Sequence, residues 1–171
     1  MQSKKNIELK ARCADLSAAR AAAMGIGAAP SGLLVQSDTY FRVPNGRLKL
    51  RETEGRPAEL IWYARANSTS LRDSDYYVLP IPDPQNTKAA LTLALGLRGV
   101  VEKRRELLIY HNVRVHLDDV AGLGTFVEFE AVISSEADME PSMQRLGTLT
   151  ATLGIRDADR VAVSYSDLAG I

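Results

Sequence analysis

The 171-residue sequence has little cysteine, no excess of either charge and no long apolar run. Its single cysteine, Cys13, excludes an internal disulfide and, without a Cys/His cluster, a zinc site. Lysine and arginine together number 21, as do aspartate and glutamate, so the net charge predicts neither a nucleic-acid surface nor a membrane surface. No run approaches the ~20 apolar residues of a membrane span, and residues 1–10 lack a signal-peptide core. We therefore expect a single domain, residues 1–171, in the cytoplasm.

Charged and apolar residues alternate along much of the chain, which is the pattern of strands with one packed face. The clearest case is Val113–Ile133, where two alternating runs flank the Gly-containing turn of residues 119–124. Helices are expected after the N-caps Asp15 and Asp83 and from Glu140, so the sequence predicts an antiparallel α+β fold. Further strands are expected at residues 6–13, 33–43, 47–52, 59–65, 75–81 and 99–110.

The charged faces of these strands each carry mostly one sign. Residues 47–51 and 103–105 present basic faces, whereas Asp118, Glu128 and Glu130 converge on an acidic face if their hairpin closes. For any one strand, a solvent-facing surface is the simpler interpretation. However, the opposite faces are apolar and three helices are available to cover them. We therefore expect the helices to pack outside and the charged faces to line the interior of a closed barrel.

A charged interior of this kind implies a charged occupant. Without one, like-charge repulsion would destabilise the barrel. Lysine and arginine suit phosphate oxygens, and carboxylates suit a hard divalent cation. No Gly-rich phosphate loop is present, so recognition would come from side chains. The pattern predicts a site for a triphosphate with bound metal.

Several short motifs follow one another in order from the first strand to the tail. They are Asn6-Ile7-Glu8-Leu9-Lys10, Leu48-Lys49-Leu50-Arg51, Lys103-x-Arg105, His116-Leu117-Asp118, Gly122-Leu123-Gly124-x-Phe126-x-Glu128-x-Glu130 and Ser164-Tyr165-Ser166-Asp167-Leu168. Together they resemble the CYTH superfamily, the triphosphate tunnel metalloenzymes, and in particular its class IV adenylate cyclase-like branch. The resemblance implies a closed eight-stranded antiparallel β-barrel, a tunnel with a polar, charged interior and helices packed outside.

The resemblance also implies roles for individual residues. The expected catalytic residues are Glu8, Lys10 and Asp118. The expected substrate-binding residues are Lys10, Lys49, Arg51, Arg65, Lys103 and Arg105, to which alternation adds Arg12 and Arg47. The expected ligands of Mg²⁺ or Mn²⁺ are Glu8, Asp118, Glu128 and Glu130. Arg114 and His116 share this face, and His116 is either a general base or a hydrogen-bonded structural residue beside Asp118.

The family's opening motif, Glu-x-Glu-x-Lys, begins here with Asn6, whose amide can bind a metal but carries no charge. The expected function is that of an adenylate cyclase, which forms cyclic AMP and pyrophosphate from ATP, or of a triphosphatase, which hydrolyses tripolyphosphate or a nucleoside triphosphate. The alternative is a non-catalytic module that binds nucleotide or polyphosphate. The expected partner is a small-molecule triphosphate rather than nucleic acid or membrane, and a homodimer is left open.

Overall fold

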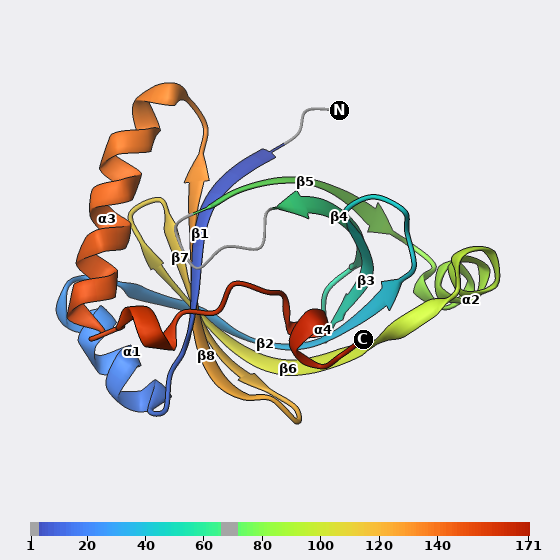
Figure 1. The fold of residues 1–171 in the computed structure, drawn as a ribbon, viewed down its shortest axis with the longest axis horizontal. Helices are drawn as coiled ribbons and strands as arrows, with labels where there is room; N and C mark the ends of the chain where they lie inside the picture. The colour runs from blue at the N-terminus through green and yellow to red at the C-terminus, as the bar shows by residue number, and fades with distance from the viewer. Residues whose placement is uncertain (1–3, 66–71) are drawn as a thin grey trace.

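The computed structural model describes residues 4–65 and 72–171, with side chains for residues 6–64 and 76–171. Within these residues, eight strands form a strongly curled sheet, and the three longer helices lie outside the curl (Figure 1). The strands are β1 (Lys4–Arg12), β2 (Ala29–Phe41), β3 (Arg47–Thr53), β4 (Ala58–Arg65), β5 (Arg72–Ile81), β6 (Leu97–Tyr110), β7 (Val113–Val120) and β8 (Gly124–Ile133). The helices are α1 (Leu16–Gly25), α2 (Pro84–Leu95), α3 (Met139–Thr152) and α4 (Tyr165–Leu168), with short 3₁₀ turns η1 (Glu136–Asp138) and η2 (Asp157–Asp159).

The strands pair in the order β1-β5-β4-β3-β2-β6-β7-β8, and β8 pairs back with β1. Each of these pairs is antiparallel. The predicted α+β class and its eight antiparallel strands are confirmed. The boundary that differs most from the prediction is the start of β2, which lies at Ala29 and not near residue 33, because a register shift between Pro30 and Gly32 lets its pairing with β6 continue past the irregular residues.

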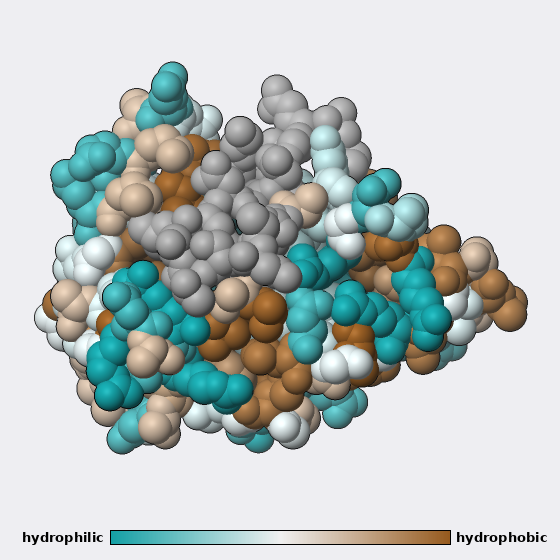
Figure 2. Space-filling view, in the orientation of Figure 1, coloured by the Kyte–Doolittle hydropathy of each residue, from teal (hydrophilic) through white to brown (hydrophobic). Residues whose placement is uncertain are grey.

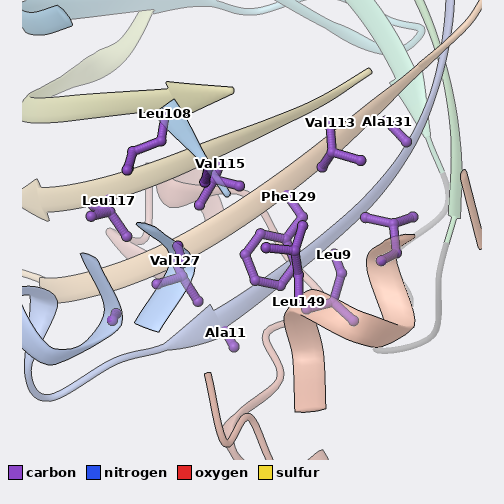
Figure 3. Packing of buried hydrophobic residues seen from close by; sticks show 14 of the residues in the cluster. Leu9, Ala11, Leu108, Val113, Val115, Leu117, Val127, Phe129, Ala131 and Leu149 are labelled. Atoms are coloured by element: carbon purple, nitrogen blue, oxygen red, sulfur yellow. The ribbon is translucent and has the colours of Figure 1, made fainter. Parts of the chain in front are cut away.

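The largest apolar cluster lies outside the curl, between the sheet and two helices. Ile7, Leu9 and Ala11 of β1 point away from Glu8 and Lys10, as strand alternation requires. They pack with apolar residues of β7, β8, α1 and α3, and Figure 3 shows Phe129 and Leu149 within this cluster. Burial of a leucine or phenylalanine of this kind contributes about 1.5–3 kcal/mol. The largest share of the hydrophobic core is therefore located outside the sheet, whereas a smaller apolar cluster that contains Ile61 and Tyr63 contributes to the cavity side.

The helices begin where their caps satisfy the first backbone N–H groups. Asp15 accepts a hydrogen bond of 2.9 Å from the amide of Ala18 at the start of α1, and Asp83 accepts one of 3.1 Å from the amide of Asn86 at the start of α2. Helix α2 covers a smaller apolar cluster that contains Phe41. Both predicted helix starts are confirmed.

The outer surface mixes hydrophilic and hydrophobic residues, with hydrophobic surface at the α2 end (Figure 2). There Leu93 is 89% exposed. Among the described helices, none has the length and apolar character that crossing a membrane requires.

Candidate functional site

The inner face of the sheet encloses a cavity of about 290 Å³ that is lined by charges of both signs. Strand alternation explains this lining, because Glu8 and Lys10 of β1, Lys49 and Arg51 of β3, Lys103 and Arg105 of β6, and Glu128 and Glu130 of β8 are spaced two residues apart and face inward. The basic lining residues are Lys10, Lys49, Arg51, Lys103, Arg105 and Arg114. The acidic lining residues are Glu8, Asp38, Glu59, Glu128 and Glu130. The cavity thus offers clustered cations and clustered carboxylates within one enclosed space.

The first cation cluster surrounds Asp38 of β2, which is 1% exposed. The Nζ atoms of Lys49 and Lys103 donate hydrogen bonds of 2.9 and 2.7 Å to Asp38 Oδ2. Arg51 donates from Nε to Oδ1 at 2.7 Å and from Nη2 to Oδ2 at 2.8 Å. Strand β2 pairs with β3 on one side and β6 on the other, so cations from both neighbouring strands reach the same carboxylate. We call Asp38, Lys49, Arg51 and Lys103 the Asp38 cluster.

The Asp38 cluster has more positive than negative groups, and the pKa values reflect this. Burial raises the pKa of Asp38, but Arg51, Lys103 and Lys49 outweigh burial and hold the pKa well below its ordinary range. Burial lowers the pKa of Lys103 to about 7, with Arg51 and Lys49 adding to the decrease and Asp38 opposing it. Burial and Arg51 likewise lower the pKa of Lys49 to about 8. The pKa values of Lys103 and Lys49 are therefore near neutral pH, and both ammonium groups lose a proton more readily than an exposed lysine does.

A second ionic cluster is centred on Arg105 of β6. Its Nε and Nη2 atoms each donate a hydrogen bond of 2.6 Å to Asp118, and Nη2 donates another of 2.9 Å to Glu128. Burial raises the pKa of Asp118, but Arg105 outweighs it and the net pKa is lowered. Asp118 is fully buried and lies behind the cavity wall. Its carboxylate therefore orients Arg105 toward the cavity.

Helix α4 brings a tyrosine to the cavity from the end of the chain. The Tyr165 hydroxyl donates a hydrogen bond of 2.7 Å to Asp118, and its ring lies 3.8 Å from the Lys10 ammonium. The Lys10 ammonium also lies 3.4 Å from Glu128. Asp167 fixes α4 through ion pairs of 2.7 Å with Arg47 and 2.9 Å with Arg98. Figure 1 shows α4 across the opening of the curled sheet.

One group of side chains has the spacing of a metal site. Among the described residues, ligand atoms of His116, Glu128 and Glu130 lie within 4.8 Å of one another. His116 Nδ1 is 3.7 Å from Glu128 and 4.0 Å from Glu130, is buried, and has no hydrogen-bond partner in the described part of the chain. The buried Oδ1 of Asn6 also lacks a hydrogen-bond partner there. The carboxylate oxygens of this group suit Mg²⁺ or Mn²⁺, and the imidazole nitrogen beside them favours a transition metal such as Mn²⁺ over Mg²⁺.

Most of the sequence-predicted site residues lie together in the cavity, and a few do not. Exposed Arg12 stacks on Phe126 at 5.1 Å, and Arg47 contacts α4; neither lines the cavity. The side chain of Arg65 lies outside the described residues. Asp118 touches Arg105 and Tyr165 and does not line the cavity. The predicted residues that line it are Glu8, Lys10, Lys49, Arg51, Lys103, Arg105, Arg114, Glu128 and Glu130.

Sequence reasoning missed Asp38, which lies at the centre of the largest cation cluster. The one available signal was its position: Asp38 alternates with Gln36 and Tyr40 within a predicted strand. A single carboxylate in a mostly uncharged run gives no charge pattern, so alternation alone could not indicate its partners.

The chain has relatives in sequence and in fold. The CYTH domain model matches residues 4–165, whereas no curated protein matches the sequence. The fold is similar to that of the PH1012 protein from Pyrococcus horikoshii, with a TM-score of 0.84, 23% identity, and coverage of 95% of this chain and 98% of that one. A candidate adenylate cyclase from Vibrio parahaemolyticus has a TM-score of 0.79 and 20% identity, over 99% of this chain and 100% of that one.

A plant protein is similar over almost the same extent. HpAC1 from Hippeastrum, which is described as having a dominant triphosphatase activity, has a TM-score of 0.65 and 14% identity over 97% of this chain and 93% of that one. At these identities the structural likeness shows a shared fold. The family model spans nearly the whole sequence. The chain therefore belongs to the CYTH domain family.

Proposed function

We propose that the protein is a metal-dependent enzyme that binds a triphosphate within its curled sheet and cleaves it. The observation that carries this proposal is that buried cations from β1, β3 and β6 line one cavity together with Glu128 and Glu130. Membership of the CYTH family supports it. In this proposal, the pairing of β1 with both β5 and β8 closes the sheet into a tunnel that surrounds the substrate.

The Asp38 cluster and Arg105 would hold the phosphate chain. Each lysine ammonium has three donors and each guanidinium has five, so these groups can contact Asp38 or Asp118 and still donate to phosphoryl oxygens. Lys10, between Glu128 and the Tyr165 ring, would contact the phosphate nearest the carboxylates. Fixed cations of this kind stabilise the negative charge that develops during phosphoryl transfer.

Glu128, Glu130 and His116 would hold a divalent cation, Mg²⁺ or Mn²⁺, with Asn6 and Glu8 on the neighbouring strand. Glu8 is directly opposite Glu130 in the β1–β8 pairing and is buried. His116 Nδ1 and Asn6 Oδ1 are buried and have no hydrogen-bond partner in the described structure. Both atoms are therefore available as metal ligands, and the residues fit such an ion. When bound, the ion would neutralise charge on the phosphate oxygens. Glu8 would orient the attacking water.

Two reactions use the same residues. Attack of water on the terminal phosphorus releases phosphate, whereas attack of a ribose hydroxyl on the α-phosphorus yields cyclic AMP and pyrophosphate. A nucleotide substrate is favoured by the less polar side chains of Ile61, Tyr76 and Val78, which line the cavity and could pack against a base. An inorganic triphosphate would use the charged residues alone.

A non-catalytic binding module is the second candidate, and Asn6 is the observation that favours it. Asn6 is 5% exposed and lines the cavity at the position where the family motif begins with glutamate. With one negative charge fewer, the site would bind a metal more weakly and could retain a triphosphate without turnover.

A product assay tests these proposals. The protein is incubated with ATP or tripolyphosphate and Mg²⁺ or Mn²⁺, and phosphate and cyclic AMP are measured separately. Metal-dependent release of either product supports the enzyme. No product, but a higher melting temperature with tripolyphosphate, supports the binding module. If the protein gives no product and no stabilisation, both proposals fail.

A further inference from the structure

In the Asp38 cluster, the carboxylate of Asp38 already contacts the basic side chains that would bind a phosphoryl group of the proposed substrate. Asp38 is buried in the C-terminal part of β2, and its two oxygens accept four hydrogen bonds of 2.7–2.9 Å from Lys49, Arg51 and Lys103. All four residues line the cavity. The carboxylate therefore occupies part of the hydrogen-bonding capacity that a phosphoryl group would use, whether or not a ligand is present.

Asp38 neutralises only part of the cluster. One carboxylate faces three basic side chains, which leaves positive charge for a ligand. Burial lowers the pKa of Lys103 to about 7, and the neighbouring cations Arg51 and Lys49 add to this decrease. An anion that enters the cluster thus gains from the remaining charge but meets the like charge of Asp38 at short range.

The balance between these two effects depends on the length of the anion. A single phosphate can contact the Asp38 cluster but must share its donors with Asp38. A triphosphate shares the same donors and also reaches Arg105 and Lys10, which line the same cavity. Asp38 lowers the affinity for both anions by a similar factor, but the additional contacts keep the affinity for the longer anion high enough for binding.

On this geometry, and resting on the proposed function, we propose that Asp38 sets an affinity threshold: it weakens the binding of every anion in the cluster, so that a triphosphate is retained at concentrations at which phosphate and pyrophosphate are not. The same carboxylate holds Lys49, Arg51 and Lys103 in place before the substrate arrives. It also disfavours retention of the shorter product anions, which would otherwise compete with the next substrate.

The test compares anion binding by the wild type and by Asp38→Asn, which keeps the shape of the side chain and removes its charge. Dissociation constants for inorganic phosphate, pyrophosphate and tripolyphosphate are measured by calorimetry in the presence of EDTA. We expect Asp38→Asn to bind all three anions at least about tenfold more tightly, so that phosphate and pyrophosphate bind in the concentration range in which the wild type binds only tripolyphosphate. Glu106→Gln is the matched control, because Glu106 lies on β6 but pairs with Arg20 of α1.

The outcomes separate this inference from the proposed function. Failure of the wild type to bind any of the three anions overturns both. Tripolyphosphate binding by the wild type with equal or weaker anion binding in Asp38→Asn overturns the role of Asp38 alone, as does wild-type binding of phosphate as tight as that of tripolyphosphate. If Asp38→Asn is not folded by circular dichroism, Asp38→Ser provides the same comparison with a smaller neutral side chain.

Discussion

Arg105 contacts Asp118 through two parallel hydrogen bonds, each 2.6 Å long, in a region where both side chains are buried. Such a fork fixes the plane of the guanidinium as well as its position. The remaining donors of Arg105 reach Glu128 and the cavity. Asp118 thus stabilises the cavity wall and sets the direction of the Arg105 guanidinium.

We expect Asp118→Asn to destabilise the protein, because it leaves Arg105 buried with less negative charge around it. The expected loss in the free energy of unfolding is on the order of 3 kcal/mol. Urea denaturation measures it. The control is Asp119→Asn, at the next position of β7, where the side chain is exposed. Equal losses in the two variants would contradict a structural role for the Arg105–Asp118 pair.

Lys49→Met should weaken tripolyphosphate binding in the absence of metal. Loss of one charge-assisted hydrogen bond costs about 1.5–3 kcal/mol, which corresponds to a decrease in affinity of roughly 10–100-fold. Lys88→Met is the control, since Lys88 pairs with Glu52 on the outside of the sheet. If both variants bind like the wild type, the Asp38 cluster is not a phosphate site.

Binding of tripolyphosphate should take up protons near pH 8. Burial lowers the pKa of Lys103 to about 7, and the pKa of Lys49 is about 8, so both lysines are partly neutral there in the free protein. A bound anion favours their charged forms, and affinity should therefore fall as the pH rises from about 7 to 9. Calorimetry in buffers of different ionisation enthalpy measures this uptake. It should decrease in Lys103→Arg, and an unchanged uptake would count against titration of Lys103.

His116→Asn should decrease the affinity for Mn²⁺ by about tenfold, because it removes a buried nitrogen donor beside Glu128 and Glu130. Electron paramagnetic resonance of free Mn²⁺ measures binding without turnover. The chain has one other histidine, exposed His111, and His111→Asn is the control. Equal Mn²⁺ affinity in both variants would exclude His116 as a ligand.

Asp167→Asn should loosen α4 while leaving the sheet intact. Asp167 pairs with Arg47 and Arg98, and its carboxylate also accepts a hydrogen bond of 2.7 Å from the Ser164 hydroxyl. Although burial opposes the change, Ser164 and Arg47 lower the pKa of Asp167 to about 2. This contribution to stability is present above about pH 4 and is lost as the pH falls toward 2.

Hydrogen exchange of residues 164–171 tests this prediction. The amides of this segment should exchange at least about tenfold faster in Asp167→Asn at neutral pH. Asp159→Asn, which breaks an ion pair with exposed Arg156, should leave them unchanged. Unaltered exchange in Asp167→Asn would show that Phe126 and Asp118 hold Tyr165 without this anchor.

Alternation predicted which face each strand turns inward, and this accounts for most of the candidate site. Glu8, Lys49, Lys103 and Glu128 all line the cavity as expected. Period-two patterning fixes the face of a residue but not its partners. Arg47, for example, has the predicted spacing, yet Asp167 pairs with it from a segment 120 residues further along the chain.

The remaining features depend on contacts between distant segments. The role of Asp38 follows from the position of β2 between β3 and β6, a neighbour relationship that no local pattern encodes. The position of Tyr165 follows from the path of the chain after α3, which passes over the opening of the sheet. The four helical residues of α4 carry too little periodicity for the sequence to predict the type of element that they form.

The apolar cluster under α1 and α3 lies on the opposite side of the sheet from the cavity. Mutations in the lining and mutations in the packing therefore act on different properties of the molecule. Replacement of an ionic side chain that lines the cavity can change which anion binds while the fold is preserved. Substitutions among the outer leucines and valines can change the melting temperature without altering the side chains of the site. Such a division allows descendants of one ancestral scaffold to diverge in activity through few substitutions.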